Sequence, residues 1–167
     1  MTETASVQKP GQAVSIASIK AQQNMGLAVL AGIGGALAAA IVWAFITVIT
    51  RMELGLIAIA LGYIVGRAVR EAGKGVDQQF GVVGAVCALF GCLLGNALSA
   101  LAFYAQANGL DFAGLMAQLS PDLIARTSGT FFKAMDLIFY GIAIYEGYKF
   151  SFKYRLNKPA PQKAATP

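Results

Sequence analysis

The chain has 167 residues, of which 57% are hydrophobic and 13% are charged, and its net charge is +5. A soluble domain carries about 25% charged residues. The apolar residues here come in long runs, which is the signature of transmembrane segments. The basic residues flank these runs, where membrane topology explains them. The sequence therefore predicts an integral membrane protein with no nucleic-acid partner.

Few side chains are suited to catalysis or metal binding. The chain has no histidine, which is the commonest general base and metal ligand. Cys87 and Cys92 would point about 140° apart on a helix, so we expect two buried thiols and neither a disulfide nor a metal pair. A catalytic role would have to use Glu53, Asp136 or Glu146. We therefore predict that the protein is not an enzyme and binds no cofactor or metal ion.

The first apolar run follows a polar N-terminal segment. Residues 1–24 are mixed and polar, which predicts a disordered cytoplasmic tail. Residues 25–50 contain no charge. As a helix they would be about 39 Å long, enough to cross a bilayer core of about 30 Å. Small residues recur at every fourth position of this first span, at Ala28, Gly32, Ala36, Ala40 and Ala44.

The second and third spans repeat this pattern of small residues. The second span, residues 54–69, is about 24 Å long, and Arg67 and Arg70 near its end can snorkel to the interface. The third span, residues 80–105, contains Asn96, whose amide needs a partner on another helix. The small positions are Ala58, Gly62 and Gly66 in the second span and Gly84, Ala88, Gly91, Gly95 and Ser99 in the third. Such stripes let helix backbones approach each other closely.

The segment between the third and fourth spans is predicted to lie outside the apolar core of the membrane. Asp111 is a helix-capping residue followed by apolar residues at helical spacing. This pattern predicts a short amphipathic helix over residues 111–119 on the membrane surface. Ser120 and Pro121 then start another helix. That helix either continues into the fourth span or bends near Gly129.

The fourth span covers residues 131–148 and is the most charged of the four. After it, aromatic residues alternate with Lys149, Lys153 and Arg155, a pattern that is typical of interfacial anchors. Together with Arg70, these three basic residues are the candidates for binding anionic lipid headgroups.

Four spans place both termini on one side of the membrane. The predicted organisation is a disordered tail (1–24), a membrane domain (25–155) and a flexible cytoplasmic tail (156–167). Ten basic residues would lie on the side of the termini and three on the other, which accounts for the 13 in the chain. The three are Arg51, Arg126 and Lys133. This bias predicts an all-α, integral membrane four-helix bundle with both termini cytoplasmic (N-in, C-in).

Polar residues inside a membrane are costly and need a partner or a function. Counting along antiparallel helices at about 1.5 Å per residue places Arg67 level with Glu146, so an ion pair between them is geometrically possible. Asn96 lies near the level of Asp136, so the two can meet through a hydrogen bond or a water, and Lys133 is an alternative partner for Asp136. These groups either fix the positions of the helices relative to one another or have a function. In the functional alternative, Asp136 lines a cavity that binds a proton, a cation or a polar substrate. The candidate residues are Asp136, Asn96, Arg67, Glu146 and Glu53.

The second span and the loop after it carry a motif. Glu53 begins an acid-Gly start, Gly62 and Gly66 form a Gly-x-x-x-Gly pair, and Ala-Val-Arg at 68–70 precedes a glycine-rich loop. Over Glu53–Gly91 the chain resembles a set of small uncharacterised bacterial multi-span membrane proteins. The resemblance implies a bacterial inner-membrane location and implies no activity.

The small-residue stripes on three spans offer more close-packing surface than one four-helix bundle needs. We therefore expect a small subunit or scaffold that packs with itself, as a homo-oligomer, or with a larger membrane complex. Two alternatives are open on the sequence. A homo-oligomeric transporter or channel would use the intramembrane polar residues. An envelope protein would use the basic aromatic segment and the surface helix to hold anionic lipids.

Overall fold

The computed structural model describes residues 6–9, 12–15, 20–51, 56–131 and 134–152. Within these ranges the fold is helical except for one small hairpin. The elements, in chain order, are β1 (Ser6–Lys9), β2 (Gln12–Ser15), α2 (Met25–Thr50), α3 (Leu56–Gly73), α4 (Gln78–Ala107), α5 (Phe112–Gln118), α6 (Pro121–Phe131) and α7 (Ala134–Phe150).

The hairpin lies in the N-terminal segment, where the sequence predicts disorder. Strands β1 and β2 pair antiparallel, with Ser6 opposite Ser15 and Lys9 opposite Gln12. The dipeptide between the strands in sequence is Pro-Gly, which is a turn signal as well as a helix breaker. The prediction of a disordered tail rested on the polar composition of residues 1–24 and did not include these strands.

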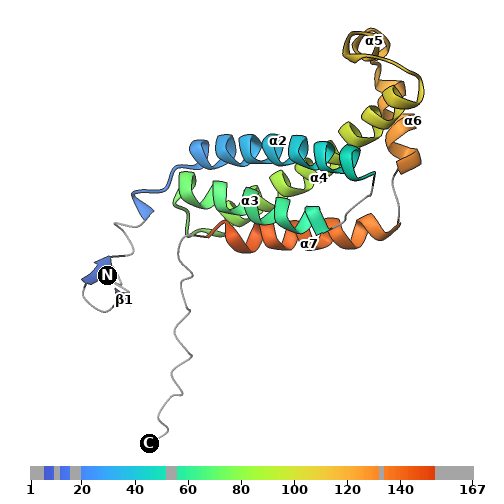
Figure 1. The fold of residues 1–167 in the computed structure, drawn as a ribbon. Coiled ribbons are helices and arrows are strands. Elements are labelled where there is room, and N and C mark those ends of the chain that lie inside the picture. Colours follow the sequence, from blue (N-terminus) through green and yellow to red (C-terminus); the bar gives the residue numbers. More distant parts are fainter. Residues whose placement is uncertain (1–5, 10–11, 16–19, 52–55, 132–133, 153–167) are drawn as a thin grey trace, which may run out of the picture.

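Four helices form a bundle, in which α3 and α4 pack against each other and α2 and α7 each pack against both (Figure 1). Contacts at one end of the bundle fix the helix directions. The backbone N–H of Asn24 donates to the carbonyl of Gly73 at 3.0 Å, and Lys20 Nζ lies 2.9 Å from Asp77 Oδ1. We call this the proximal end, and the opposite end, beyond which α5 and α6 lie, the distal end. Helices α2 and α4 are therefore parallel, and α3 runs antiparallel to both.

Small residues fill the interface between the helices. A Cβ atom added at Gly32 would come within 2.8 Å of Cys87 Sγ, and one at Gly91 within 3.2 Å of Ala36 Cβ. The predicted stripes are buried inside the bundle on α3 and α4, and on α2 as far as Ala40. A spacing of four residues drifts by about 40° per step on a helix of 3.6 residues per turn. The buried line on α2 therefore moves from the predicted Ala44 to Trp43.

Large apolar side chains cover the outside of the bundle. Leu30 and Phe45 on α2, Val86 on α4 and Leu137 on α7 are all exposed, whereas the interior holds mostly Ala, Gly, Val and Cys. A soluble monomer rarely exposes apolar patches larger than a few hundred Å². Among the described helices, α2 and α4 are long and apolar enough to cross a membrane. The chain therefore has an all-helical bundle with two candidate membrane-spanning helices.

Helix α3 is longer than its predicted span. It continues through Arg70 and Glu71 to Gly73, whereas the predicted second span ends at residue 69. Arg67 and Glu71 form an i,i+4 ion pair across the added turn, which supports a helix. Glycine then ends it, because glycine is a poor helix former. With 18 residues, α3 is about 27 Å long.

Helices α5 and α6 begin at the predicted capping residues. The N–H of Gly114 donates to Asp111 Oδ1 at 2.8 Å, the N–H of Leu123 donates to Ser120 Oγ at 3.1 Å, and Pro121 is the first residue of α6. Both helices lie beyond the distal end (Figure 1), with α6 packed on α4. Helix α6 ends at Phe131 and α7 begins at Ala134; the fourth span was predicted from residue 131.

Candidate functional site

A hydrogen bond between side chains joins α4 to α7 inside the bundle. Asn96 Nδ2 donates to the hydroxyl oxygen of Tyr140 at 2.9 Å, and Tyr140 is buried. The expectation that the Asn96 amide faces another helix is confirmed. Its partner is Tyr140, one helical turn further along α7 than the predicted Asp136. A tyrosine side chain is long enough to bring its hydroxyl to the level of the amide.

Asp136 lies next to this hydrogen bond. It is half-buried in the first turn of α7, where the helix dipole favours a carboxylate. It interacts electrostatically with Tyr140, four residues further along the same helix. We call these three residues the Asn96–Tyr140–Asp136 cluster. It offers hydroxyl and amide oxygens beside one carboxylate, a set that suits a proton, a cation or a polar solute. Lys133, the other predicted partner of Asp136, lies outside the described residues.

Two buried hydroxyl groups occur nearby, on α2 and α4. Trp43 packs on Gly95, where an added Cβ would lie 3.1 Å from the indole ring. Thr47 and Ser99 are each one turn further toward the distal end on these facing stripes. Ser99 Oγ donates to the Gly95 carbonyl at 2.8 Å. Thr47 is only 1% exposed, and its hydroxyl has no hydrogen-bond partner among the residues that the structure describes. The sequence analysis did not single out Thr47, although it is one of few hydroxyl residues in an apolar run.

The ion pair that the sequence allows between Arg67 and Glu146 does not form in the described part of the chain, where Arg67 pairs with Glu71. Arg67 Nη2 lies 3.3 Å from Glu71 Oε1, and its side chain is 45% exposed. The two residues are nevertheless at the same depth, because a Cβ at Gly66 would lie 3.2 Å from the Glu146 carbonyl oxygen. Since Gly66 faces α7, Arg67 is rotated by about 100° from that contact. Its side chain reaches Glu71 along its own helix.

Aromatic and basic side chains gather at the proximal end. Lys149 Nζ lies 5.3 Å from the ring centroid of Tyr145 and 5.4 Å from that of Phe150, within the range of a cation–π interaction. Arg70 Nε is 3.9 Å from Glu71 Oε1. These are the two predicted headgroup-binding residues that the structure describes, and both lie where the bundle meets the N-terminal segment.

Some predicted residues lie outside the described part of the chain. They are Glu53, Lys153 and Arg155. Cys87 and Cys92 are buried and free, as the sequence predicts. In the ranges that the structure describes, no three His, Cys, Asp or Glu side chains lie close enough to hold a metal ion.

Comparison with known proteins gives no match: no family model matches the chain, and no curated protein or solved structure is similar to it.

Proposed function

We propose that all four bundle helices cross a membrane, and that the protein is a small scaffold or subunit of the bacterial inner membrane. Helices α3 and α7 pack along α2 and α4, so they would enter the bilayer with these two. Their outward faces carry exposed Leu56 and Ile64 on α3 and Leu137 and Ile138 on α7. In water these faces would cost about 25 cal/mol per Å² of apolar surface.

The distribution of basic residues supports cytoplasmic termini. Among the described residues with placed side chains, the proximal end carries five basic residues and the distal end two. The five are Lys20, Arg67, Arg70, Lys74 and Lys149, and the two are Arg51 and Arg126. Cytoplasmic flanks of membrane helices are enriched in Lys and Arg. In the proposed orientation, α5 and α6 lie on the outer side of the membrane.

The surface that supports a scaffold differs from the stripes of small residues that the sequence predicts. The predicted stripes of small residues are buried inside the bundle, so they are not available to a partner. Gly34 is different, because it is exposed and a Cβ there would meet no atom within 4 Å. Exposed Ala38 follows one turn later. This outward small-x-x-x-small pair, in a helix without charge, is the observation that supports packing against another membrane helix.

The test is the mass of the particle in lipid nanodiscs, measured by native mass spectrometry. We expect a homo-oligomer or a complex with a second polypeptide, and we expect Gly34→Leu to disperse it. Gly141→Leu is the matched control, because a Cβ at Gly141 on α7 also meets no atom within 4 Å. A monomeric wild-type protein without a partner would reject the scaffold.

The Asn96–Tyr140–Asp136 cluster favours a second candidate, a transporter or channel in which Asp136 handles a proton, a cation or a polar solute. Intramembrane carboxylates often mark such pathways. The tight glycine contacts between α2, α3 and α4 argue against a path between those helices within one copy, so a path would have to form between copies. Flux into liposomes tests this candidate. Wild-type protein giving no flux above protein-free liposomes would reject it, as would full flux in Asp136→Asn.

A further inference from the structure

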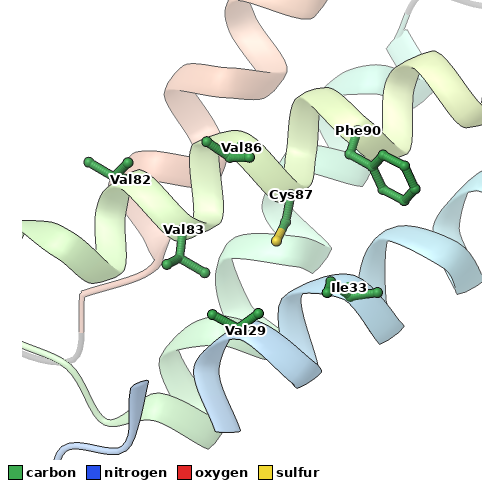
Figure 2. A pocket seen from close by; sticks show the side chains of 7 residues that line it. All are labelled: Val29, Ile33, Val82, Val83, Val86, Cys87 and Phe90. Carbon is green, nitrogen blue, oxygen red and sulfur yellow. The ribbon is translucent and has the colours of Figure 1, made fainter. Parts of the chain in front are cut away.

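An apolar groove runs along the outside of the bundle between α2 and α4 (Figure 2). Its volume is about 430 Å³. Val86 and Phe90 form one wall on α4, and Ile33 belongs to the wall on α2. Cys87 lies between the two helices with its sulfur toward α2. Because α2 and α4 are parallel, the groove runs along the axis of the bundle.

The lining of the groove selects the kind of molecule that fits it. From Val82 to Phe90 the groove is about 12 Å long, and its walls are apolar. A hydrocarbon chain lying along it would make apolar contacts with both helices.

A pair of opposite charges lies across the proximal ends of the two groove-forming helices. Lys20 precedes α2 and Asp77 precedes α4, and their side chains meet at 2.9 Å while being 50% and 42% exposed. Asp77 makes no side-chain hydrogen bond to cap α4. An adjacent ammonium and carboxylate complement a headgroup that itself carries a phosphate and an amine. In a membrane this end of the groove lies at the interface, where headgroups are found.

We propose that the α2–α4 groove is a specific site for a zwitterionic phospholipid. One acyl chain lies against Val86 and Cys87, the phosphate lies near Lys20, and the headgroup amine lies near Asp77. This inference rests on the membrane location proposed above. It names a lipid site separate from the cluster of Lys149, Tyr145 and Phe150 on α7.

The test compares two substitutions at equally exposed positions. Val86 is 61% exposed and lines the groove, whereas Ile41 on α2 is 62% exposed and lies outside it. The probe is phosphatidylethanolamine in nanodiscs that also contain phosphatidylglycerol, with bound lipid counted by native mass spectrometry after transfer to mild detergent. We expect wild type and Ile41→Trp to retain phosphatidylethanolamine, and Val86→Trp to lose at least tenfold. Asp77→Asn is expected to shift retention toward phosphatidylglycerol.

Cys87 supplies an independent readout that does not depend on a bulky substitution. In a Cys92→Ala background it is the single thiol of the chain. We expect a lipophilic maleimide to label Cys87 at least tenfold faster after delipidation, and added phosphatidylethanolamine to restore protection. Equal labelling in both states would overturn the proposal.

Other results would overturn it as well. One is that Val86→Trp and Ile41→Trp retain equal amounts of lipid, and another is that the wild-type protein retains no phosphatidylethanolamine. A third is that the wild-type protein is a lipid-free dimer and Val86→Trp converts it to a monomer. Carbonate extraction of cell membranes separates this failure from failure of the membrane location. Protein that stays in the membrane pellet but retains no lipid rejects only the lipid site. Protein released by carbonate rejects both.

Discussion

Gly62 of α3 lies directly against the backbone of Ala143 of α7, and a Cβ atom at Gly62 would come within 2.8 Å of Ala143 Cα. One turn further, Gly66 lies against the Gly147 carbonyl oxygen, where an added Cβ would be 3.0 Å away. These two glycines therefore set the distance between α3 and α7. In lipid, such close packing is a main source of helix association, because the hydrophobic effect does not drive helices together there.

We expect Gly62→Leu to lower the free energy of unfolding in detergent by about 1–3 kcal/mol, because a side chain at this position must push α7 away. The measurement is a denaturation midpoint with rising fraction of SDS. Gly141→Leu, on the outward face of α7, is the control and is expected to leave the midpoint unchanged. Equal midpoints for wild type and Gly62→Leu would show that α3 and α7 are not held by this contact.

The hydrogen bond between Asn96 and Tyr140 can be measured by a double-mutant cycle. Interhelical hydrogen bonds in membrane proteins contribute about 0.6 kcal/mol on average and up to about 1.7 kcal/mol. We expect Asn96→Leu and Tyr140→Phe to lower the free energy of unfolding singly, and the double variant to lose less than the sum by roughly this amount. Strict additivity would mean that the two side chains do not interact.

The Thr47 hydroxyl is buried without a hydrogen-bond partner in the described part of the chain, so it contributes a desolvation cost and no bond there. We expect Thr47→Val, which keeps the shape of the side chain, to be neutral or to raise the free energy of unfolding by about 1 kcal/mol. Ser99→Ala, which removes a hydroxyl bonded to the Gly95 carbonyl, is the comparison and is expected to be neutral or mildly destabilising. A loss of more than about 1 kcal/mol in Thr47→Val would indicate that a bound water satisfies the hydroxyl.

The small-residue interfaces could be predicted from the sequence because they depend only on composition and spacing. Gly62, Gly66 and Gly95 recur near the helical repeat, and a stripe of glycines can pack closely whichever helix it meets. Depth could also be predicted, because the rise per residue is constant. Counting residues placed Arg67 level with Glu146, and the contact at Gly66 confirms that level.

Rotation about the helix axis could not be predicted, and it decides which side chains meet. Arg67 is one residue away from the contact at Gly66, which turns its side chain toward Glu71. Asn96 meets Tyr140 and not Asp136, an error of one turn, or about 5.4 Å. The groove near Cys87 was missed for a related reason. It lies between α2 and α4, and no single run of residues shows that two helices are parallel neighbours.

The ion pair of Arg67 with Glu71 can be tested by substituting Glu71 and Glu146 in turn. Because Arg67 pairs with Glu71 on its own helix, we expect Glu71→Gln to lower the free energy of unfolding by only about 0.3–0.5 kcal/mol, as for other exposed i,i+4 pairs. Glu146→Gln is expected to have no measurable effect at neutral pH. If Glu146→Gln lowered the free energy of unfolding more than Glu71→Gln, the result would support an ion pair between Arg67 and Glu146.

The contact of Lys149 with the rings of Tyr145 and Phe150 holds a positive charge where headgroups would lie. A basic residue near an anionic membrane surface contributes about 1 kcal/mol, or about a fivefold change in affinity. We expect Lys149→Gln to reduce the phosphatidylglycerol retained by the purified protein by about this factor at low salt, with a smaller effect at high salt. Arg126→Gln is the control, because its guanidinium lies 2.9 Å from Asp122 at the distal end. Equal loss in both variants would mean that anionic lipid follows net charge and has no preferred place on α7.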